Sequence, residues 1–297
     1  MDFTRIIYET VEPGIARITM NRPEMRNAQD DLMQWEMQQA FLDADINDDI
    51  RVIIFAGAGK DFSSGHDMSG MRRDGGKRHE APDDSIIGRA VANKMTGMEH
   101  QLKREDHIYM ESHRLIRNLS KPTIAMVQGN CLAGALMTCS MCDLVVAADD
   151  AKFGDPVVRM TPAGVEILFH PYDFGFRKAK EMLWTGDPLT AEEAFRAGYV
   201  YKVVPREQLE EATMDLARRI AMNMPVAVSL TKRAINFAWD AMGQRLGWDY
   251  HLLIHQMSHA SDEAKKWQAE RAKALGKGGV REMLKARDEK FKAGGGD

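Results

Sequence analysis

Short apolar runs alternate with helical patterns along the first two thirds of the chain. The runs at 14–20, 52–55, 123–127 and 144–148 are bounded by glycine, proline or polar residues, which is typical of β-strands. The run at 52–55 is apolar throughout, as expected for a strand that is covered on both faces. Between the first two runs, apolar residues recur with helical spacing over 27–46. This alternation predicts an α/β core.

Helical patterns replace the alternation after about residue 205. An amphipathic pattern covers 209–223, and Pro225 separates it from a helix expected at 226–238. We therefore divide the chain into an α/β core, residues 1–205, and a helical C-terminal region, residues 206–297.

Three further helices are expected, one within the core and two near the C-terminus. A long helix is expected from about Asp84 or later to Leu119. Ser261 is an expected N-cap for a helix that stops at Gly276, and a separate charged helix is expected at 281–292.

Two polar segments fall outside the regular elements. Residues 72–79 are charged and contain glycine, so we expect either a solvated loop or a lid over an acyl pocket. The glycine-rich tail, residues 294–297, is expected to be disordered.

Composition and charge exclude several classes of protein. The chain has 297 residues, of which 44% are hydrophobic and 28% charged, with a net charge of −4. That charge gives no reason to expect nucleic acid or an anionic membrane as the main partner. No apolar run approaches the roughly 18 residues that a membrane span needs. The N-terminus resembles neither a signal nor a transit peptide, so a cytoplasmic location is expected.

Three cysteines, Cys131, Cys139 and Cys142, lie in an apolar stretch. The last two have the C-x-x-C spacing of redox and zinc sites, but no second ligand pair completes a zinc site. Apolar surroundings disfavour the reactive thiolate, so we expect buried, inert thiols and no metal site. The 21 methionines are interpreted as filling gaps in the core.

Three sequence segments together resemble the crotonase (enoyl-CoA hydratase/isomerase) superfamily. The first reads I-T-M-N-R-P-E-M-R-N-A at 18–28, and the second reads F-S-S-G-H-D-M at 62–68. The third starts with K-P-T-I-A-M-V-Q-G at 121–129 and continues through A-G-A at 133–135. Each piece alone is a weak signal, and their order and spacing make the resemblance specific.

The resemblance implies a fold, a ligand and an assembly. The fold would be a spiral of repeated ββα units followed by a helical region that builds trimers, which commonly pair into hexamers. The ligand would be an acyl-CoA thioester, so that coenzyme A is part of the substrate and no cofactor is bound permanently.

The resemblance also implies a backbone oxyanion hole that stabilises a thioester enolate. By match to the motifs, its donors are the N–H groups of His66 and Gly134. Preorganised donors of this kind are worth about 3 kcal/mol each in the transition state. Gly134 lies where a small-residue loop enters an apolar helix, and a helix start leaves free N–H groups.

The side chains around this loop have less certain roles. The imidazole of His66 is an additional titratable group, and Asp67 is expected to make a hydrogen bond that holds the loop. The resemblance assigns several residues to the coenzyme A entrance, and arginine suits phosphate through bidentate contacts. These residues are Arg22, Arg26, Ala28, Ser64, Asp67 and Met68.

The chain departs from the family where hydration requires two carboxyl groups. Standard hydratases carry glutamates at the positions of Met137 and Val157. An apolar side chain cannot transfer a proton, so these two residues are expected only to line the substrate pocket, and two-glutamate hydration is in doubt.

Glu166 and Asp155 are the candidate replacements for the missing acids, and His170 is a lesser one. A single carboxylate over an enolate site suits isomerisation of a double bond, or cleavage of a thioester or C–C bond. Two alternatives stay open: a protein that binds acyl-CoA without turnover, and a serine hydrolase using Ser63 or Ser64. The hydrolase lacks the G-x-S-x-G elbow, which argues against it.

Overall fold

The computed structural model describes residues 2–68, 81–82, 85–92, 95, 97–160 and 163–292. Its strands are β1 (Ile6–Glu12), β2 (Ile15–Met20), β3 (Val52–Gly57), β4 (Thr123–Val127), β5 (Asn130–Leu132), β6 (Leu144–Ala148), β7 (Lys152–Gly154), β8 (Leu189–Thr190) and β9 (Lys202–Val204). Its helices are α1 (Asp31–Ile46), α2 (Ile86–Val91), α3 (Gly97–Glu105), α4 (Glu111–Asn118), α5 (Gly134–Cys139), α6 (His170–Asp173), α7 (Phe176–Thr185), α8 (Ala191–Arg196), α9 (Leu209–Ala221), α10 (Pro225–Ala241), α11 (Gln244–His259) and α12 (Asp262–Lys292).

The larger sheet has the strand order β1-β2-β3-β4-β6-β9. Only the β1–β2 pair is antiparallel, and the remaining neighbours are parallel. A smaller sheet of β5, β7 and β8 lies beside α5. Every residue of β3 is buried, which explains its continuous apolar sequence.

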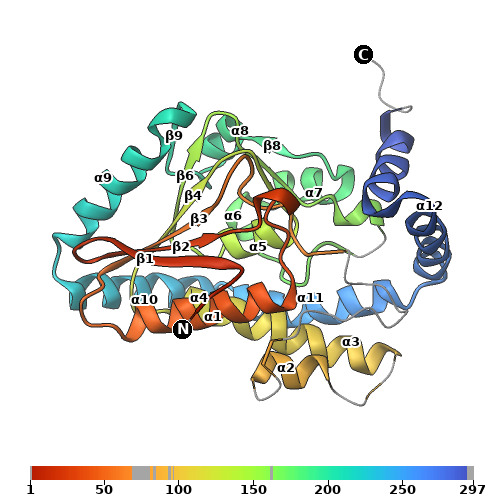
Figure 1. The fold of residues 1–297 in the computed structure, drawn as a ribbon, viewed down its shortest axis with the longest axis horizontal. Coiled ribbons are helices and arrows are strands. Elements are labelled where there is room, and N and C mark those ends of the chain that lie inside the picture. Colours follow the sequence, from red (N-terminus) through yellow and green to blue (C-terminus); the bar gives the residue numbers. More distant parts are fainter. Residues whose placement is uncertain are drawn as a thin grey trace.

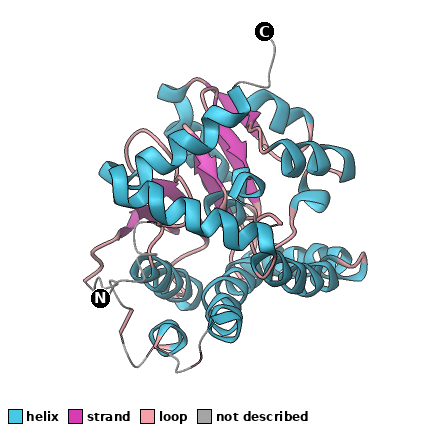
Figure 2. Cartoon of the chain, turned by 90° about the vertical axis from the view of Figure 1, so that its right-hand side faces the viewer, coloured by secondary structure: helices cyan, strands magenta, loops and turns pink. Residues whose placement is uncertain are grey.

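Helices cover both faces of the larger sheet (Figures 1 and 2). On one face, α9 packs on β3, β4 and β6 around a core that contains Ile54, Ile124 and Leu216. The other face carries the main core, which includes Phe41 of α1 and Trp248 of α11. The observed fold therefore confirms the predicted α/β class with a helical C-terminal region.

Several predicted element boundaries are confirmed, and two predicted helices have other limits in the structure. Strands β4 and β6 have the predicted limits, and α9 and α10 fall where their patterns indicated. The long helix expected from about Asp84 or later to Leu119 is found only from Gly97, as the continuous run of α3, the π-helical segment η3 (Asp106–Met110) and α4; α2 is separate from it. The helix expected to stop at Gly276 instead continues as α12.

Strand β1 and helix α11 were not predicted. The segments expected as a loop or lid at 72–79 and as a disordered tail at 294–297 lie outside the described residues. No helix in the described ranges is long and apolar enough to cross a membrane.

The helices that follow residue 205 pack against the α/β core and share its buried side chains. Leu209 and Leu216 of α9 share a core with strand residues, and Trp248 and Leu252 of α11 belong to the main core.

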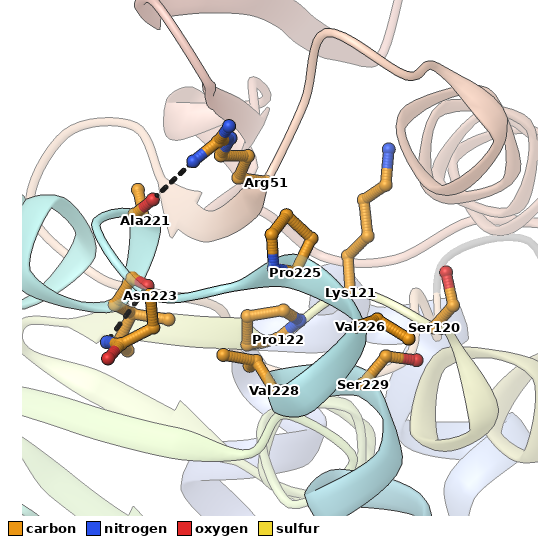
Figure 3. Close-up of a pocket in the computed structure, with 11 residues that line it drawn as sticks. Arg51, Ser120, Lys121, Pro122, Ala221, Asn223, Pro225, Val226, Val228 and Ser229 are labelled. Atoms are coloured by element: carbon orange, nitrogen blue, oxygen red, sulfur yellow. Dashed lines mark hydrogen bonds between the residues drawn. The ribbon is translucent and has the colours of Figure 1, made fainter.

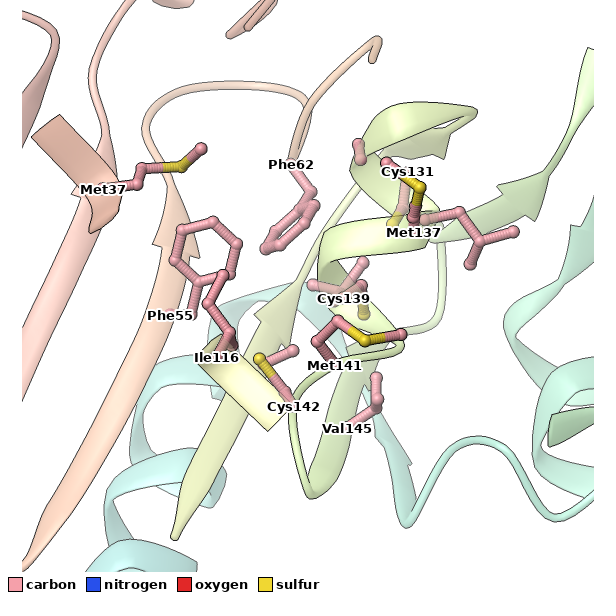
Figure 4. Close-up of a cluster of buried hydrophobic side chains, with 14 of the residues drawn as sticks. Met37, Phe55, Phe62, Ile116, Cys131, Met137, Cys139, Met141, Cys142 and Val145 are labelled. Atoms are coloured by element: carbon pink, nitrogen blue, oxygen red, sulfur yellow. The ribbon is translucent and has the colours of Figure 1, made fainter. Parts of the chain in front are cut away.

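The three cysteines are free and buried in the main core, as predicted (Figure 4). Burial raises the pKa of Cys131 and Cys142 well above the usual thiol value. Met137 and Met141 fill space beside them, which supports the interpretation of the methionines as packing residues.

Asn27 ties the loop after β2 to the loop after β3. Its side-chain amide donates to the carbonyl oxygens of Ala58 (2.8 Å), Asp61 (3.0 Å) and Phe62 (3.0 Å). Its own carbonyl accepts a hydrogen bond from Ser63 Oγ at 2.7 Å. Asn27 is fully buried and has a φ of 52°, a conformation that asparagine tolerates better than most residues.

We predict that Asn27→Ala lowers the free energy of unfolding by about 2–4 kcal/mol, because buried carbonyl groups lose their donor. Urea unfolding followed by circular dichroism measures the change. Asn223→Ala is the matched control, since Asn223 is exposed and bonds only to carbonyls within its own helical turn. A loss for Asn27→Ala no larger than that of the control contradicts this role.

Candidate active site

The loop after β3 and the loop before α5 approach each other at two glycines. A Cβ built on Gly65 would lie 2.7 Å from the carbonyl oxygen of Leu132 and 3.2 Å from the nitrogen of Gly134. Gly65 also has a φ of 92°, which only glycine adopts without strain. These two conditions explain why glycine is needed here and why the two backbones can touch.

The N–H of His66 points away from Gln29, the residue that faces it in an isolated parallel β-bridge. Gln29 pairs with the residues on either side of His66: it donates to Gly65 O at 2.9 Å and accepts from Asp67 N at 2.9 Å. In such a parallel bridge the central residue presents its own N–H to the other side.

Gly134 is the first residue of α5, so its N–H has no partner within the helix. Ala133 precedes it with a φ of 51°, a costly conformation for a residue that carries a Cβ. No hydrogen bond is donated by the N–H of Gly134 or of His66 to another group in the described ranges. The structure therefore brings together the two predicted oxyanion donors with both N–H groups available.

The imidazole of His66 lies directly over Gly134. A Cβ at position 134 would come within 2.2 Å of His66 Nε2, so glycine is required for this ring position. The ring stacks on Tyr109 with a centroid separation of 4.1 Å, and its Nδ1 lies 3.8 Å from Glu166 Oε1. His66 Nε2 and Glu166 Oε2 are both buried without a hydrogen-bond partner.

Burial shifts the two titratable groups in opposite directions. The pKa of Glu166 is raised well above its ordinary value by desolvation and then by the nearby charge of Glu105. The pKa of His66 is lowered to about 3, again mainly by desolvation. Burial therefore favours the uncharged form of both groups: it makes the Glu166 carboxyl harder to ionise and the His66 imidazole harder to protonate.

Met137 and Val157 are both buried, the first one helical turn after Gly134 and the second in the short helix η4 (Pro156–Met160). The two residues that were expected to line the substrate pocket are therefore apolar side chains inside the protein.

Asp155 is held by the protein interior and is fully buried. It accepts backbone hydrogen bonds from Val157 (3.1 Å) and Val165 (2.9 Å), and His170 Nε2 lies 3.3 Å away. These contacts lower the pKa of Asp155 despite its burial. Through these contacts Asp155 and His170 support the segment that carries Glu166.

The residues assigned to the coenzyme A entrance divide into two groups. Arg22 pairs with Asp67 at 2.9 Å and with Asp30 at 3.2 Å, so its charge is compensated inside the protein. Arg26 keeps 69% of its side chain exposed and is 3.8 Å from Asp61. Ala28 is buried, while Ser64 and Met68 are partly accessible on the same loops.

Sequence reasoning missed the polar side chains that surround the pair from the segment 97–118. Tyr109 stacks on His66, and Arg104 lies over the Tyr109 ring at 5.6 Å. A separate hollow of about 230 Å³ lies at the start of α10, where Arg51 meets residues 120–122 and 220–229 (Figure 3). Its lining contains none of the candidate site residues.

Comparison with known proteins gives one consistent family. A family model described as enoyl-CoA hydratase/isomerase matches residues 10–87 and 88–274. The Mycobacterium tuberculosis protein named "Putative enoyl-CoA hydratase EchA13" is 42% identical over 261 residues, covering 87% of this chain and 82% of that protein. An enoyl-CoA hydratase/isomerase structure from Xanthobacter autotrophicus Py2 is 30% identical with a TM-score of 0.81, covering 98% of this chain and 99% of that one. An enoyl-CoA hydratase structure from Mycobacterium smegmatis is 25% identical with a TM-score of 0.82, covering 97% and 96%.

The raised pKa of Glu166 predicts a pH-dependent stability. The folded protein holds a proton that the unfolded chain releases above its ordinary value of 4.5. Stability therefore falls as pH rises from there to the folded pKa, by about 1.4 kcal/mol per pH unit. Glu166→Gln removes this loss, so urea unfolding from pH 5 to pH 8 should show the variant gaining on the wild type. The exposed Glu207→Gln serves as the control. A constant difference across this range contradicts the assignment.

Proposed function

The chain belongs to the enoyl-CoA hydratase/isomerase family, and from that premise we propose that it binds an acyl-CoA thioester and stabilises its enolate. The carbonyl oxygen of the thioester accepts hydrogen bonds from the N–H groups of His66 and Gly134. The observation that supports this proposal is the contact of the two loops at Gly65, which brings the loop of His66 against the backbone of Gly134. Each such donor contributes about 3 kcal/mol to transition-state stabilisation.

Glu166 is the proposed acid/base. In its carboxylate form it removes a proton from a carbon atom next to the conjugated system, and the electron pair moves onto the thioester oxygen as an enolate. The protonated carboxyl then returns the proton to another carbon. A raised pKa favours this cycle because the ionised group is a stronger base and takes its proton back more readily than an ordinary glutamate.

This chemistry corresponds to double-bond isomerisation more closely than to hydration. Hydration needs a second carboxyl group to position and activate water, and Met137 and Val157 supply none. Cleavage is the second candidate. C–C cleavage would release an enolate, and thioester cleavage would pass through the tetrahedral oxyanion formed when water attacks the carbonyl carbon and would expel the CoA thiol; the same two N–H groups would stabilise either anion.

Coenzyme A recognition is proposed on the loops beside the hole. Arg26 is the candidate for a phosphate contact because its guanidinium is open to solvent, whereas Arg22 is engaged with two carboxylates. Ala28, Ser64 and Met68 would line the path of the pantetheine arm.

A homotrimer, or a dimer of trimers, is the proposed assembly. Large apolar side chains of α10 and α11 are exposed to solvent in the single chain, and burying them between subunits would stabilise an assembly. They include Leu230, Phe237, Leu246, Tyr250, Leu253 and Met257.

Exchange of the α-protons of butyryl-CoA with solvent deuterium tests the catalytic proposal, because it requires an enolate but no particular pathway. We expect the wild type to incorporate deuterium, measured by mass spectrometry, and Glu166→Gln to slow the exchange by about 10²–10⁴-fold. Glu207→Gln should exchange at the wild-type rate.

His66→Ala separates the two roles of His66 in the same assay. If its backbone N–H is the working group, the variant keeps its exchange rate within about tenfold, since alanine has the same N–H. Bound butyryl-CoA without any exchange in the wild type contradicts the enzyme proposal and favours a protein that binds acyl-CoA without turnover.

A further inference from the structure

Three potential metal ligands lie close together near the candidate active site. Glu105 ends α3, while His255 and His259 lie one turn apart on α11. Their ligand atoms all lie within 4.8 Å of one another, and this is the one such group found among the described residues. Glu105 and His255 are buried, and His259 is partly buried.

We propose that Glu105, His255 and His259 bind a divalent transition-metal cation such as Zn²⁺. One carboxylate oxygen and two imidazole nitrogens form a ligand set that suits this class of ion. Three protein ligands leave at least one coordination position for water or another small ligand.

His255 is oriented as a metal ligand by the bond on its other ring nitrogen. Its Nδ1 lies 2.9 Å from the carbonyl oxygen of Gly164, and only a protonated Nδ1 can donate to a carbonyl. In the neutral ring, Nε2 then carries a free lone pair, and this atom faces the cluster. An imidazole whose second nitrogen donates to a carbonyl is the usual arrangement around bound metals.

The separations between the ligand atoms suit a small cation. His255 Nε2 lies 3.0 Å from His259 Nε2 and 3.5 Å from Glu105 Oε2. Bond lengths of 2.0–2.1 Å to zinc in tetrahedral geometry place ligand atoms about 3.3 Å apart. Small side-chain adjustments therefore complete the site.

Glu105 is positioned by amide groups rather than neutralised by a cation of its own. Gln101 donates to Oε1 at 3.0 Å, and Gln256 donates to Oε2. The neighbouring Arg104 pairs with Asp31. A bound cation would compensate a carboxylate at this buried position.

The site is connected to the segment that carries Glu166. The carbonyl that holds His255 belongs to Gly164, two residues before Glu166 in the chain. A bound cation would therefore hold this segment in place through His255. The inference goes beyond the proposed function and does not depend on it, since binding can be measured without acyl-CoA.

Metal binding is tested with tag-free, full-length protein. The protein is stripped with a chelator, dialysed against Zn²⁺ alone, desalted and analysed for bound metal by mass spectrometry. We expect about one zinc per chain and a rise of a few degrees in the midpoint of thermal unfolding, because the cation binds only the folded state.

Three variants locate the ion. His259→Ala and Glu105→Gln each remove one ligand, and His255→Asn removes Nε2 while its amide can still donate to Gly164. All three should lose the bound zinc and the thermal shift. His107→Gln is the control, since His107 lies on η3 outside the cluster and the variant should retain both.

The proposal is overturned if the wild type retains no zinc after desalting. It is also overturned if folded His255→Asn and His259→Ala proteins, checked by circular dichroism, retain as much zinc as the wild type, because the ion is then bound elsewhere.

Discussion

The backbone at Gly65 approaches the backbone at Gly134 so closely that no side chain fits between them. A Cβ on Gly65 would overlap Leu132 O, and a Cβ on Gly134 would overlap the His66 ring. This contact brings the loop that carries His66 against the start of α5, where we propose that the N–H groups of His66 and Gly134 act together. Preorganised donors stabilise a developing charge because they need no reorganisation when it appears. The proposed chemistry depends on this arrangement.

Other parts of the fold maintain that contact from several directions. Asn27 fixes the loop after β3 from one side, and the strained backbone at Ala133 turns Gly134 into place on the other. Helix α11 contacts the segment that carries Glu166, because His251 and His255 lie within hydrogen-bond distance of the carbonyl oxygens of Val165 and Gly164. The C-terminal helices are therefore part of the support of the segment around Glu166.

The sequence predicted the parts of this molecule that depend on local pattern. The apolar strands β4 and β6 and the amphipathic helix α9 were found from their periodicity, and Gly134 from its small-residue motif. Strand β1 was missed because only one of its residues, Ile6, is buried and its sequence lacks a clear alternation of apolar and polar positions. The cluster of Glu105, His255 and His259 could not be predicted, because about 150 residues separate the carboxylate from the imidazoles and only tertiary packing joins them. The opposite environments of Asp155 and Glu166 likewise arise from burial and hydrogen bonding that sequence spacing does not reveal.

The central claim is that two backbone N–H groups polarise a thioester carbonyl, and the vibration of that carbonyl tests it most directly. Infrared difference spectra would be recorded for butyryl-CoA labelled with ¹³C at the thioester carbon, free and bound to the protein. The account predicts a shift of the carbonyl stretch to lower frequency on binding, and the same shift in Glu166→Gln, which leaves both backbone donors in place. Bound ligand whose carbonyl stretch equals that of free butyryl-CoA in water would contradict it.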